Sequence, residues 1–467
     1  MSTATPVEHQ ADPHLTGVFA PVVEEVDVPD VRVEGELPAE LDGDYVRNGP
    51  NPRFAPIGAY VYPLDGDGML HRVRIGDGRA RYTNRFVRTP ALVAEEAAGR
   101  ALWPGITGLG LGPGAEVVGP ELAHTTKDLP DINVVRHHGR LLALAESATP
   151  FLVSPELQTL GRETFCGTLP AGITAHPKID PRTGEMVAFC YGVEEPYLTW
   201  SVIGPDGDTV RAATPIEEVD RPVMIHDMAL TERFVVLVLA PFFFDIAGAL
   251  RGGSPLSWEP DRGTRIALVP RDGSRVRWFH EESFWMWHTA NAHERGGRVV
   301  LDYVQWTLPG GLVRGASTGS LSRLVLDLAA GTSTRTVLAD RSMEFPRIDD
   351  RALTASHTVV AVSLRTAPGS VNDPDTLGWF DTGTGELAVW ESPGLALGEQ
   401  VFVPRPGDPD PGHGWWITYA TDRAELTSRV LVLPAADPTA GPIARIHLPQ
   451  RVPLGLHGSW LPAVVPT

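Results

Sequence analysis

The stretch TRIALVPRDG, Thr264–Gly273, contains the pattern that decides the fold: a short apolar run with β-branched residues, followed by an Asp-Gly turn. A run of this length and composition is typical of a β-strand, and Asp-Gly is typical of a tight turn. Similar runs recur along the chain and are also predicted to be strands: Arg140–Glu146, Phe234–Ala240, Arg298–Gln305, Ser322–Leu328, Thr358–Leu364 and Arg429–Pro434.

The composition also favours short elements joined by many turns. Glycine and proline account for 48 and 43 of the 467 residues, whereas roughly 12% is usual for the two together. Helical periodicity is weak, and Ala91–Ala101 is the best helix candidate. Strands that do not alternate with helices indicate an all-β architecture. A sandwich would need several copies to use this length, whereas one propeller accommodates it.

The charge and the cysteines limit the class of protein. The net charge of −19 disfavours a nucleic-acid partner, because a polyanion would be repelled. The longest apolar run, Val235–Leu250, is interrupted by Pro241 and Asp245, and no signal peptide is evident. Cys166 and Cys190 cannot form a disulfide framework. We therefore expect a soluble, cytoplasmic protein.

Four histidines stand in apolar or small-residue surroundings, where an unpartnered imidazole would cost desolvation energy. They are His176 in TAHPK, His226 in MIHDM, His288 in WMWHTAN and His457 in LHGSW. Neutral imidazoles suit iron, zinc and copper. Their spacing matches no local metal motif, but a fold of radial repeats can bring distant residues to one axis.

Seven motifs, in order, resemble those of the carotenoid cleavage oxygenase family, which is related to the lignostilbene dioxygenases. They are YVRNGPNP (Tyr45–Pro52), LDGDGMLH (Leu64–His71), NRFVRT (Asn84–Thr89), MIHDM (Met224–Met228), WHTANAHE (Trp287–Glu294), FPRI (Phe345–Ile348) and VPLGLHGSW (Val452–Trp460). The resemblance implies a seven-bladed β-propeller with an apolar cap of loops and short helices over the face that carries an iron ion. Residues 1–34 would form an irregular lead-in and 35–467 a single domain, with cap insertions at about 91–130 and 241–262.

The resemblance also implies a non-haem Fe(II) held by four histidines, with three glutamates behind them. Carried over position by position, the ligands are His176, His226, His288 and His457, and the carboxylates behind the last three are Glu146, Glu344 and Glu399. Such carboxylates orient the imidazole rings and offset the charge of the metal. His176 has no expected carboxylate partner, and no organic cofactor or catalytic residue beyond the iron centre is implied. Asp227 is a poor co-ligand, because adjacent strand residues point to opposite faces.

Two departures from the family pattern bear on the substrate. Ile132 stands where many members carry a threonine beside the open iron position, so it would crowd that position without a hydroxyl. Ala145 stands where the stilbene-cleaving branch carries a lysine that ionises a phenol with an upstream tyrosine, and Leu102–Pro120 contains no tyrosine. Phenolate activation lacks its usual agent, which favours a polyene substrate.

We therefore predict a dioxygenase that cleaves a carbon–carbon double bond of a carotenoid or apocarotenoid with O₂, giving two carbonyl products. The alternatives are cleavage of a stilbene or phenylpropanoid alkene (4-vinylphenol or isoeugenol type), a retinoid-isomerase-like activity, and a propeller that binds a ligand without chemistry. Phe243, Trp285 and Trp306 are predicted pocket walls or membrane-facing residues, with core packing as the alternative. The segment Pro241–Leu250 is the candidate for contact with a membrane surface.

Overall fold

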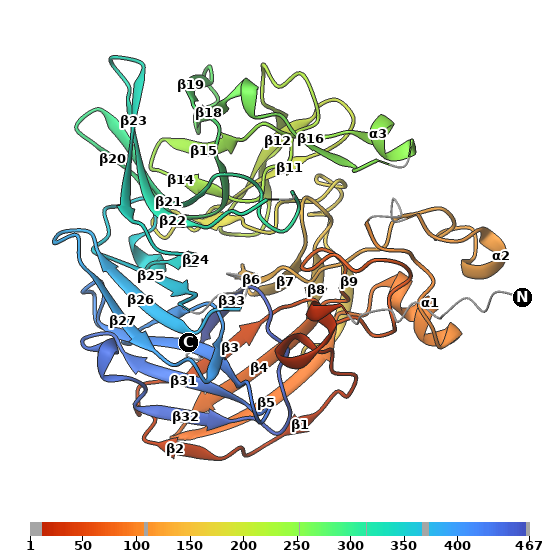
Figure 1. The fold of residues 1–467 in the computed structure, drawn as a ribbon, viewed down its shortest axis with the longest axis vertical. Coiled ribbons are helices and arrows are strands. Elements are labelled where there is room, and N and C mark those ends of the chain that lie inside the picture. The colour runs from red at the N-terminus through yellow and green to blue at the C-terminus, as the bar shows by residue number, and fades with distance from the viewer. Residues whose placement is uncertain (1–11, 107–110, 252, 314, 367–372, 464–467) are drawn as a thin grey trace, which may run out of the picture.

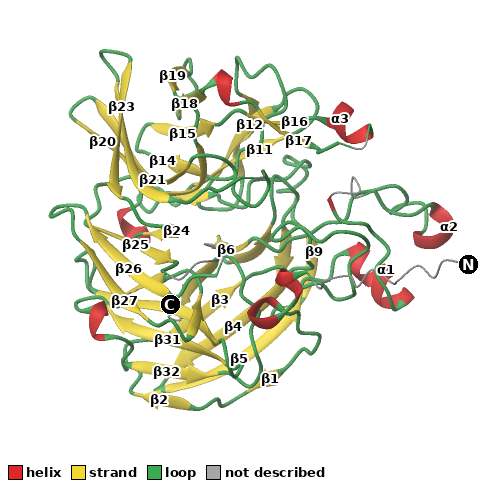
Figure 2. Ribbon diagram, in the orientation of Figure 1, coloured by secondary structure: helices red, strands yellow, loops and turns green. Residues whose placement is uncertain are grey.

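The structure is a computed structural model that describes residues 12–106, 111–251, 253–313, 315–366 and 373–463. Figure 1 shows small sheets arranged around a common centre, and Figure 2 shows that helices are few. Seven of the described sheets form the blades of a propeller, so the predicted all-β, seven-bladed fold is confirmed. Each predicted strand segment also contains a strand, including the opening stretch, which begins with β18 (Thr264–Pro270).

Five blades are each built from four strands that follow one another along the chain. Blade 2 consists of β6 (Asn133–His137), β7 (Arg140–Leu144), β8 (Phe151–Val153) and β9 (Thr159–Arg162), and blade 3 of β10 (Lys178–Ile179), β11 (Met186–Tyr191), β12 (Leu198–Ile203) and β13 (Thr209–Pro215). Blade 4 consists of β14 (Met228–Leu230), β15 (Phe234–Leu239), β18 and β19 (Arg277–Glu281), with a separate hairpin, β16 (Phe242–Phe244) and β17 (Leu256–Trp258), inserted after β15. Blade 5 consists of β20 (Trp285–Arg295), β21 (Arg298–Trp306), β22 (Ser320–Asp327) and β23 (Thr332–Ala339), and blade 6 of β24 (Met343–Arg347), β25 (Val359–Leu364), β26 (Thr376–Asp381) and β27 (Leu387–Glu391).

The remaining two blades contain strands from both ends of the chain, which closes the ring. Blade 1 has the order β1 (Asp27–Val28), β5 (Arg79–Phe86), β4 (Met69–Gly76), β3 (Gly43–Arg47) and β33 (Gly458–Pro462). Blade 7 has the order β2 (Val33–Gly35), β32 (Ala444–His447), β31 (Ser428–Pro434), β30 (Gly414–Asp422) and β28 (Leu395–Leu397), and β29 (Val401–Pro404) also pairs with β30. The described part of the lead-in, residues 12–34, therefore contributes β1 and the start of β2 to these sheets, besides two 3₁₀ turns, Pro13–Leu15 and Gly17–Phe19.

Packing between blades explains why several strands are apolar on both faces. Every residue of β12 and of β15 is buried, because both faces of each sheet lie against a neighbouring blade. The outer strand β13 instead alternates between exposed and partly exposed residues. The core is thus a ring of apolar layers between blades, which leaves the axis for polar side chains.

The three described α-helices lie on one side of the ring, at the right of Figure 1. They are α1 (Pro90–Ala98), α2 (Ala115–Val118) and α3 (Ile246–Leu250). Thr89 caps α1 by accepting a hydrogen bond from the Leu92 backbone N–H. The predicted end of this helix at Ala101 was wrong, because Gly99 takes a left-handed conformation (φ 68°) and stops it. Three more 3₁₀ turns complete the described elements: Pro260–Arg262, Asp350–Ala352 and Pro438–Ala440.

A buried charge cluster fixes α1 to the propeller. Lys127 Nζ lies 2.6 Å from Asp67 Oδ1 and 2.6 Å from Glu95 Oε2, and both carboxylate side chains are at most 5% exposed. Glu95 belongs to α1, and Asp67 lies just before β4 in the DGDG segment. Glu95 also accepts hydrogen bonds from the backbone N–H groups of Leu102 and Trp103. One lysine therefore joins the helix, the loop after it and blade 1.

The substitution Lys127→Met should lower the free energy of unfolding by about 3 kcal/mol, because two buried carboxylates lose their cation. Chemical denaturation measures this change, and limited proteolysis should cut first near residues 91–130. Arg100→Met is the matched control, since Arg100 is exposed and donates only to its neighbour's carbonyl. A loss below about 0.5 kcal/mol, the scale of an ordinary surface substitution, would contradict the anchoring role.

Candidate metal centre

The four histidines of the sequence analysis meet at the axis from four different blades. His176 precedes β10, His226 precedes β14, His288 lies in β20 and His457 precedes β33. All four are buried, and one ring nitrogen from each lies within 4.8 Å of the others. The Nε2 atom of His226 is 3.1 Å from Nε2 of His176 and 3.1 Å from Nε2 of His288. The structure therefore brings the whole set together.

Irregularities in the inner strands direct side chains to this point. The pairing of β20 with β21 shifts register twice between Met286 and Asn291, on either side of Thr289. Such bulges change which way a strand side chain faces and are frequent beside active sites. His288 lies within this irregular part of β20, which also contains Trp287, whose ring is 5.0 Å from that of His226.

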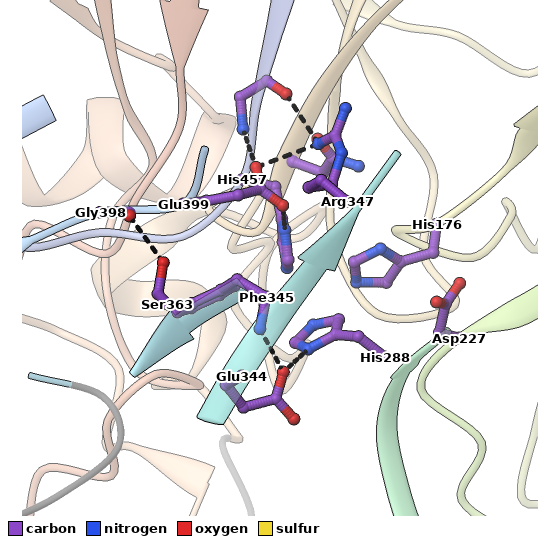
Figure 3. A network of polar contacts seen from close by, with 12 residues as sticks. His176, Asp227, His288, Glu344, Phe345, Arg347, Ser363, Gly398, Glu399 and His457 are labelled. Carbon is purple, nitrogen blue, oxygen red and sulfur yellow. Dashed lines mark hydrogen bonds and ion pairs between the residues drawn. The ribbon is translucent and has the colours of Figure 1, made fainter. Parts of the chain in front are cut away.

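Each predicted glutamate lies against the histidine expected for it. Glu344 Oε2 is 2.6 Å from Nδ1 of His288, and Glu399 Oε1 is 2.9 Å from Nδ1 of His457. Glu146 Oε1 contacts Nδ1 of His226. Among the described residues, the structure places no carboxylate against the ring of His176. Figure 3 shows two of these pairs and the separate position of His176.

These contacts specify what the centre can bind. A histidine that donates its Nδ1–H to a carboxylate carries a bare lone pair on Nε2. Two such lone pairs 3.1 Å apart, as on His226 and His288, cannot hydrogen-bond each other. A cation between the rings would satisfy them all. Four buried imidazoles therefore fit a transition-metal ion such as iron.

Burial favours the neutral form of two of the four imidazoles, the form that binds a metal. Burial lowers the pKa of His457 to about 4, against the opposing pull of Glu399. Burial also lowers the pKa of His176 well below its usual value, and the neighbouring histidines add to the effect. For His288, burial acts in the same direction, but contact with Glu344 outweighs it and the pKa is raised. His176 and His457 are thus neutral at pH 7 and ready to bind a metal.

The outer oxygen of each glutamate is held by different donors. The Tyr191 hydroxyl donates to Glu146 Oε2 at 3.2 Å, and the Trp306 indole N–H donates to Glu344 Oε1 at 2.8 Å. Glu399 Oε2 accepts from the Gly458 backbone N–H at 3.0 Å and is 3.1 Å from Arg347 Nη1. Burial tends to raise the pKa of Glu399, but Arg347 and His457 lower it to about 2.

Asp227 is turned to other partners, which agrees with its exclusion as a co-ligand. Its Oδ1 is 2.8 Å from Lys178 Nζ, and its Oδ2 accepts hydrogen bonds from the backbone N–H and hydroxyl of Thr289 at 2.8 Å each. Burial tends to raise its pKa, but the lysine outweighs that effect and the pKa is lowered. Asp227 therefore stays ionised and fixes His288 indirectly, through the next residue of β20.

The predicted wall residues occupy different environments. Ile132 is buried in an apolar cluster with Leu456, and its carbonyl accepts a hydrogen bond from the backbone N–H of His457. Trp285 is 1% exposed and packs edge-on against Phe242. Trp306 supports Glu344, as described above. Phe243 is half-buried beneath the guanidinium of Arg221, 3.7 Å from the ring centre, so it does not face solvent freely.

A cavity of about 350 Å³ reaches the centre along the propeller axis. Its lining includes His176, His288 and His457, together with the charged side chains of Lys178 and Arg347. The centre therefore opens on a cavity whose wall carries charged as well as apolar side chains.

Four residues that contact the centre were not predicted as site residues: Tyr191, Trp287, Phe345 and Arg347. The last three lie within the quoted motifs Trp287–Glu294 and Phe345–Ile348, beside predicted ligands or carboxylates, so their position was a usable signal. Tyr191 ends β11 and carries no local signal. Its hydrogen bond to Glu146 is seen only in the structure, where the end of β11 lies beside that glutamate.

His288→Ala should abolish high-affinity binding of Fe(II) or Co(II), because it removes a proposed ligand and deprives Glu344 of its histidine partner. Glu399→Gln should weaken binding by about 10- to 100-fold, since the amide oxygen still accepts from His457 but the charge is lost. Anaerobic titration with Co(II) followed by visible absorption measures both. The exposed His280→Ala is the control, since His280 lies outside the histidine cluster. Unchanged affinity of Glu399→Gln would contradict the assigned role.

Comparisons with known proteins agree with this geometry. The model of the family described as retinal pigment epithelial membrane protein, RPE65, matches residues 19–462. A carotenoid cleavage oxygenase of Mycobacterium tuberculosis is 34% identical, over 99% of this chain and 100% of its own length. A carotenoid 9,10(9′,10′)-cleavage dioxygenase of Phaseolus vulgaris is 32% identical over 96% and 89%. A resveratrol cleavage oxygenase of Aspergillus fumigatus is 33% identical over 96% and 95%.

Solved structures give the same result. A lignostilbene dioxygenase of Pseudomonas brassicacearum superimposes with a TM-score of 0.88 at 30% identity, over 98% of this chain and 100% of that one. A cobalt-substituted apocarotenoid oxygenase of Synechocystis superimposes with a TM-score of 0.83 at 27% identity, over 95% and 97%. With its propeller and its buried histidine centre, the chain belongs to the RPE65 and carotenoid cleavage oxygenase family.

Proposed function

We propose that this protein is an Fe(II)-dependent dioxygenase that cleaves one carbon–carbon double bond of a carotenoid or apocarotenoid with O₂, giving two carbonyl products. The observation that carries the proposal is the convergence of four buried imidazoles at the axis, three of them backed by carboxylates. A ferrous ion held by imidazole ligands suits dioxygen chemistry if coordination positions stay open for O₂. Membership of a family of oxidative alkene-cleaving enzymes supports the same reaction.

The residues of this chain have defined parts in that reaction. His176, His226, His288 and His457 would hold the iron. The bound ion would supply the activation of O₂ for addition across the double bond. The three glutamates orient the rings, and the apolar environment of Ile132 excludes water beside the centre.

The surroundings of Glu146 favour a polyene over a phenolic alkene. Ala145 has no side-chain base to ionise a phenol, and the outer oxygen of Glu146 accepts from the Tyr191 hydroxyl, a donor whose pKa burial raises well above its usual value. A neutral tyrosine cannot take a proton from a phenol. A polyene needs no such ionisation, because its conjugation already supplies electrons.

Products formed from a panel of carotenoids, apocarotenals and stilbenes under ¹⁸O₂ test this proposal. We expect a pair of carbonyl products from an apocarotenal, with label in both products before exchange, and much slower cleavage of resveratrol or a 4-hydroxystyrene. Ala145→Lys should raise activity on the phenolic substrates. Exclusive cleavage of the phenolic alkenes by the unaltered protein would overturn the substrate assignment, and isomerisation without O₂ uptake would overturn the reaction.

We also propose that α1 to α3 and the hairpin β16–β17 cover the iron-bearing face and touch a membrane surface, from which an apolar substrate would be drawn. Apolar side chains are exposed on these elements: Ile246 is 42% and Leu250 72% exposed on α3, and Val117 is 49% exposed on α2. Exposed apolar groups gathered on one side are typical of interfacial contact. Among the described residues, no helix combines the length and apolarity needed to cross a bilayer.

The double variant Ile246→Asp, Leu250→Asp should reduce co-flotation with phosphatidylcholine liposomes by at least about five-fold, because each aspartate would have to be desolvated at the interface. Val337→Asp is the matched control, since Val337 is 50% exposed on β23, away from the helices (Figure 1). Flotation equal to that of the unaltered protein would contradict the proposed contact.

A further inference from the structure

Arg347 brings a positive charge into the outer layer of the metal centre. Its Nη1 lies 3.1 Å from Oε2 of Glu399 and donates to the carbonyl oxygen of Gly458 at 3.3 Å. The side chains of Arg347 and Glu399 are 19% and 2% exposed. Figure 3 shows the guanidinium joined to the carboxylate that holds His457. The ion pair is therefore largely buried, and Glu399 connects Arg347 to the proposed ligand His457.

The other two carboxylates have no such partner among the described residues. The outer oxygens of Glu146 and Glu344 accept from neutral donors, a tyrosine hydroxyl and a tryptophan N–H. Both oxygens of Glu399 are held by donors, and one donor is a cation. Three buried carboxylates carry three negative charges; a divalent metal would supply two positive charges and Arg347 the third, its Nη2 also lying 3.3 Å from the exposed Asp350. A buried group of charges is least costly when it is balanced in this way.

The backbone is shaped to permit this arrangement. In a regular strand, Glu344 and Arg347 would point to opposite faces, because they are an odd number of residues apart. The pairing of β24 with β25 shifts register between these two residues, so one extra residue lies in β24. Phe345 there has a φ of 55°, a strained conformation for a phenylalanine, and its ring packs against His288 and His457 at 5.5 and 5.4 Å. The bulge lets both charged side chains reach the axis.

We propose that Arg347 is a positioning residue of the metal centre, holding the carboxylate of Glu399 in the orientation that presents His457 to the metal. The inference rests on the proposed function, in that it takes the four histidines as the ligands. Arg347 also bridges blade 6, through β24, to blades 7 and 1, through Glu399 and Gly458. It therefore fixes the side of the centre where the two ends of the chain close the ring.

A double-mutant cycle on Co(II) affinity tests the proposal without using enzyme activity. Arg347→Met should weaken Co(II) binding about ten-fold and change the visible spectrum of the bound cobalt. In a Glu399→Gln background, Arg347→Met should have less than a two-fold further effect, because Arg347 acts through that carboxylate. Arg347→Lys should recover part of the affinity, since lysine keeps the charge but not the planar fork of donors.

Arg351→Met is the matched control, because Arg351 lines the same cavity but pairs with Asp349. Unfolding of the metal-free variants separates loss of stability from loss of positioning. The proposal is overturned if Arg347→Met leaves Co(II) affinity and spectrum unchanged, if affinity rises because only repulsion was removed, or if the two substitutions act independently. Failure of the unaltered protein to bind Co(II) would instead overturn the proposed function.

Discussion

The centre depends on one constraint: four buried imidazoles converge, with one ring nitrogen of each within 4.8 Å of the others. His226 and His288, whose Nδ1 atoms face carboxylates, present Nε2 lone pairs 3.1 Å apart, which cannot hydrogen-bond each other but would be satisfied by a cation between them. Carboxylates behind three of the rings fix which nitrogen carries the proton, and their charge attracts the ion. Seven blades, each apolar on both faces, supply the rigid frame that holds these groups together.

The four rings are not equivalent, and their differences have chemical meaning. His176 has no carboxylate behind it in the described part of the chain, so it is the ligand with the least electron donation from its surroundings. The ring of His457 is backed by an ion pair, and those of His226 and His288 by carboxylates held by neutral donors. The centre thus has one side without carboxylates, at His176, and a supported side where glutamates contact His226, His288 and His457. The strained Phe345 lies on the supported side, where its ring packs against both His288 and His457.

Much of this could be predicted from the sequence, for identifiable reasons. Apolar runs ended by turns predicted the strands, and the resemblance of seven motifs to a known family implied the histidines and glutamates that the structure brings together. What could not be predicted depends on irregular backbone. The bulge in β24 places Arg347 on the same side as Glu344, against the alternation of a strand, and Tyr191 reaches Glu146 only through the packing of blade 3 on blade 2. The end of α1 was misplaced because Gly99 was not read as a cap.

The measurement that most directly tests the account is iron K-edge X-ray absorption of the protein reconstituted anaerobically with Fe(II). The account predicts one iron per chain with four imidazole nitrogens in its first shell and further oxygen ligands from solvent. A chain that retains no iron, or an ion with fewer imidazoles than four, would contradict it, since at least one ring would then face away from the common centre.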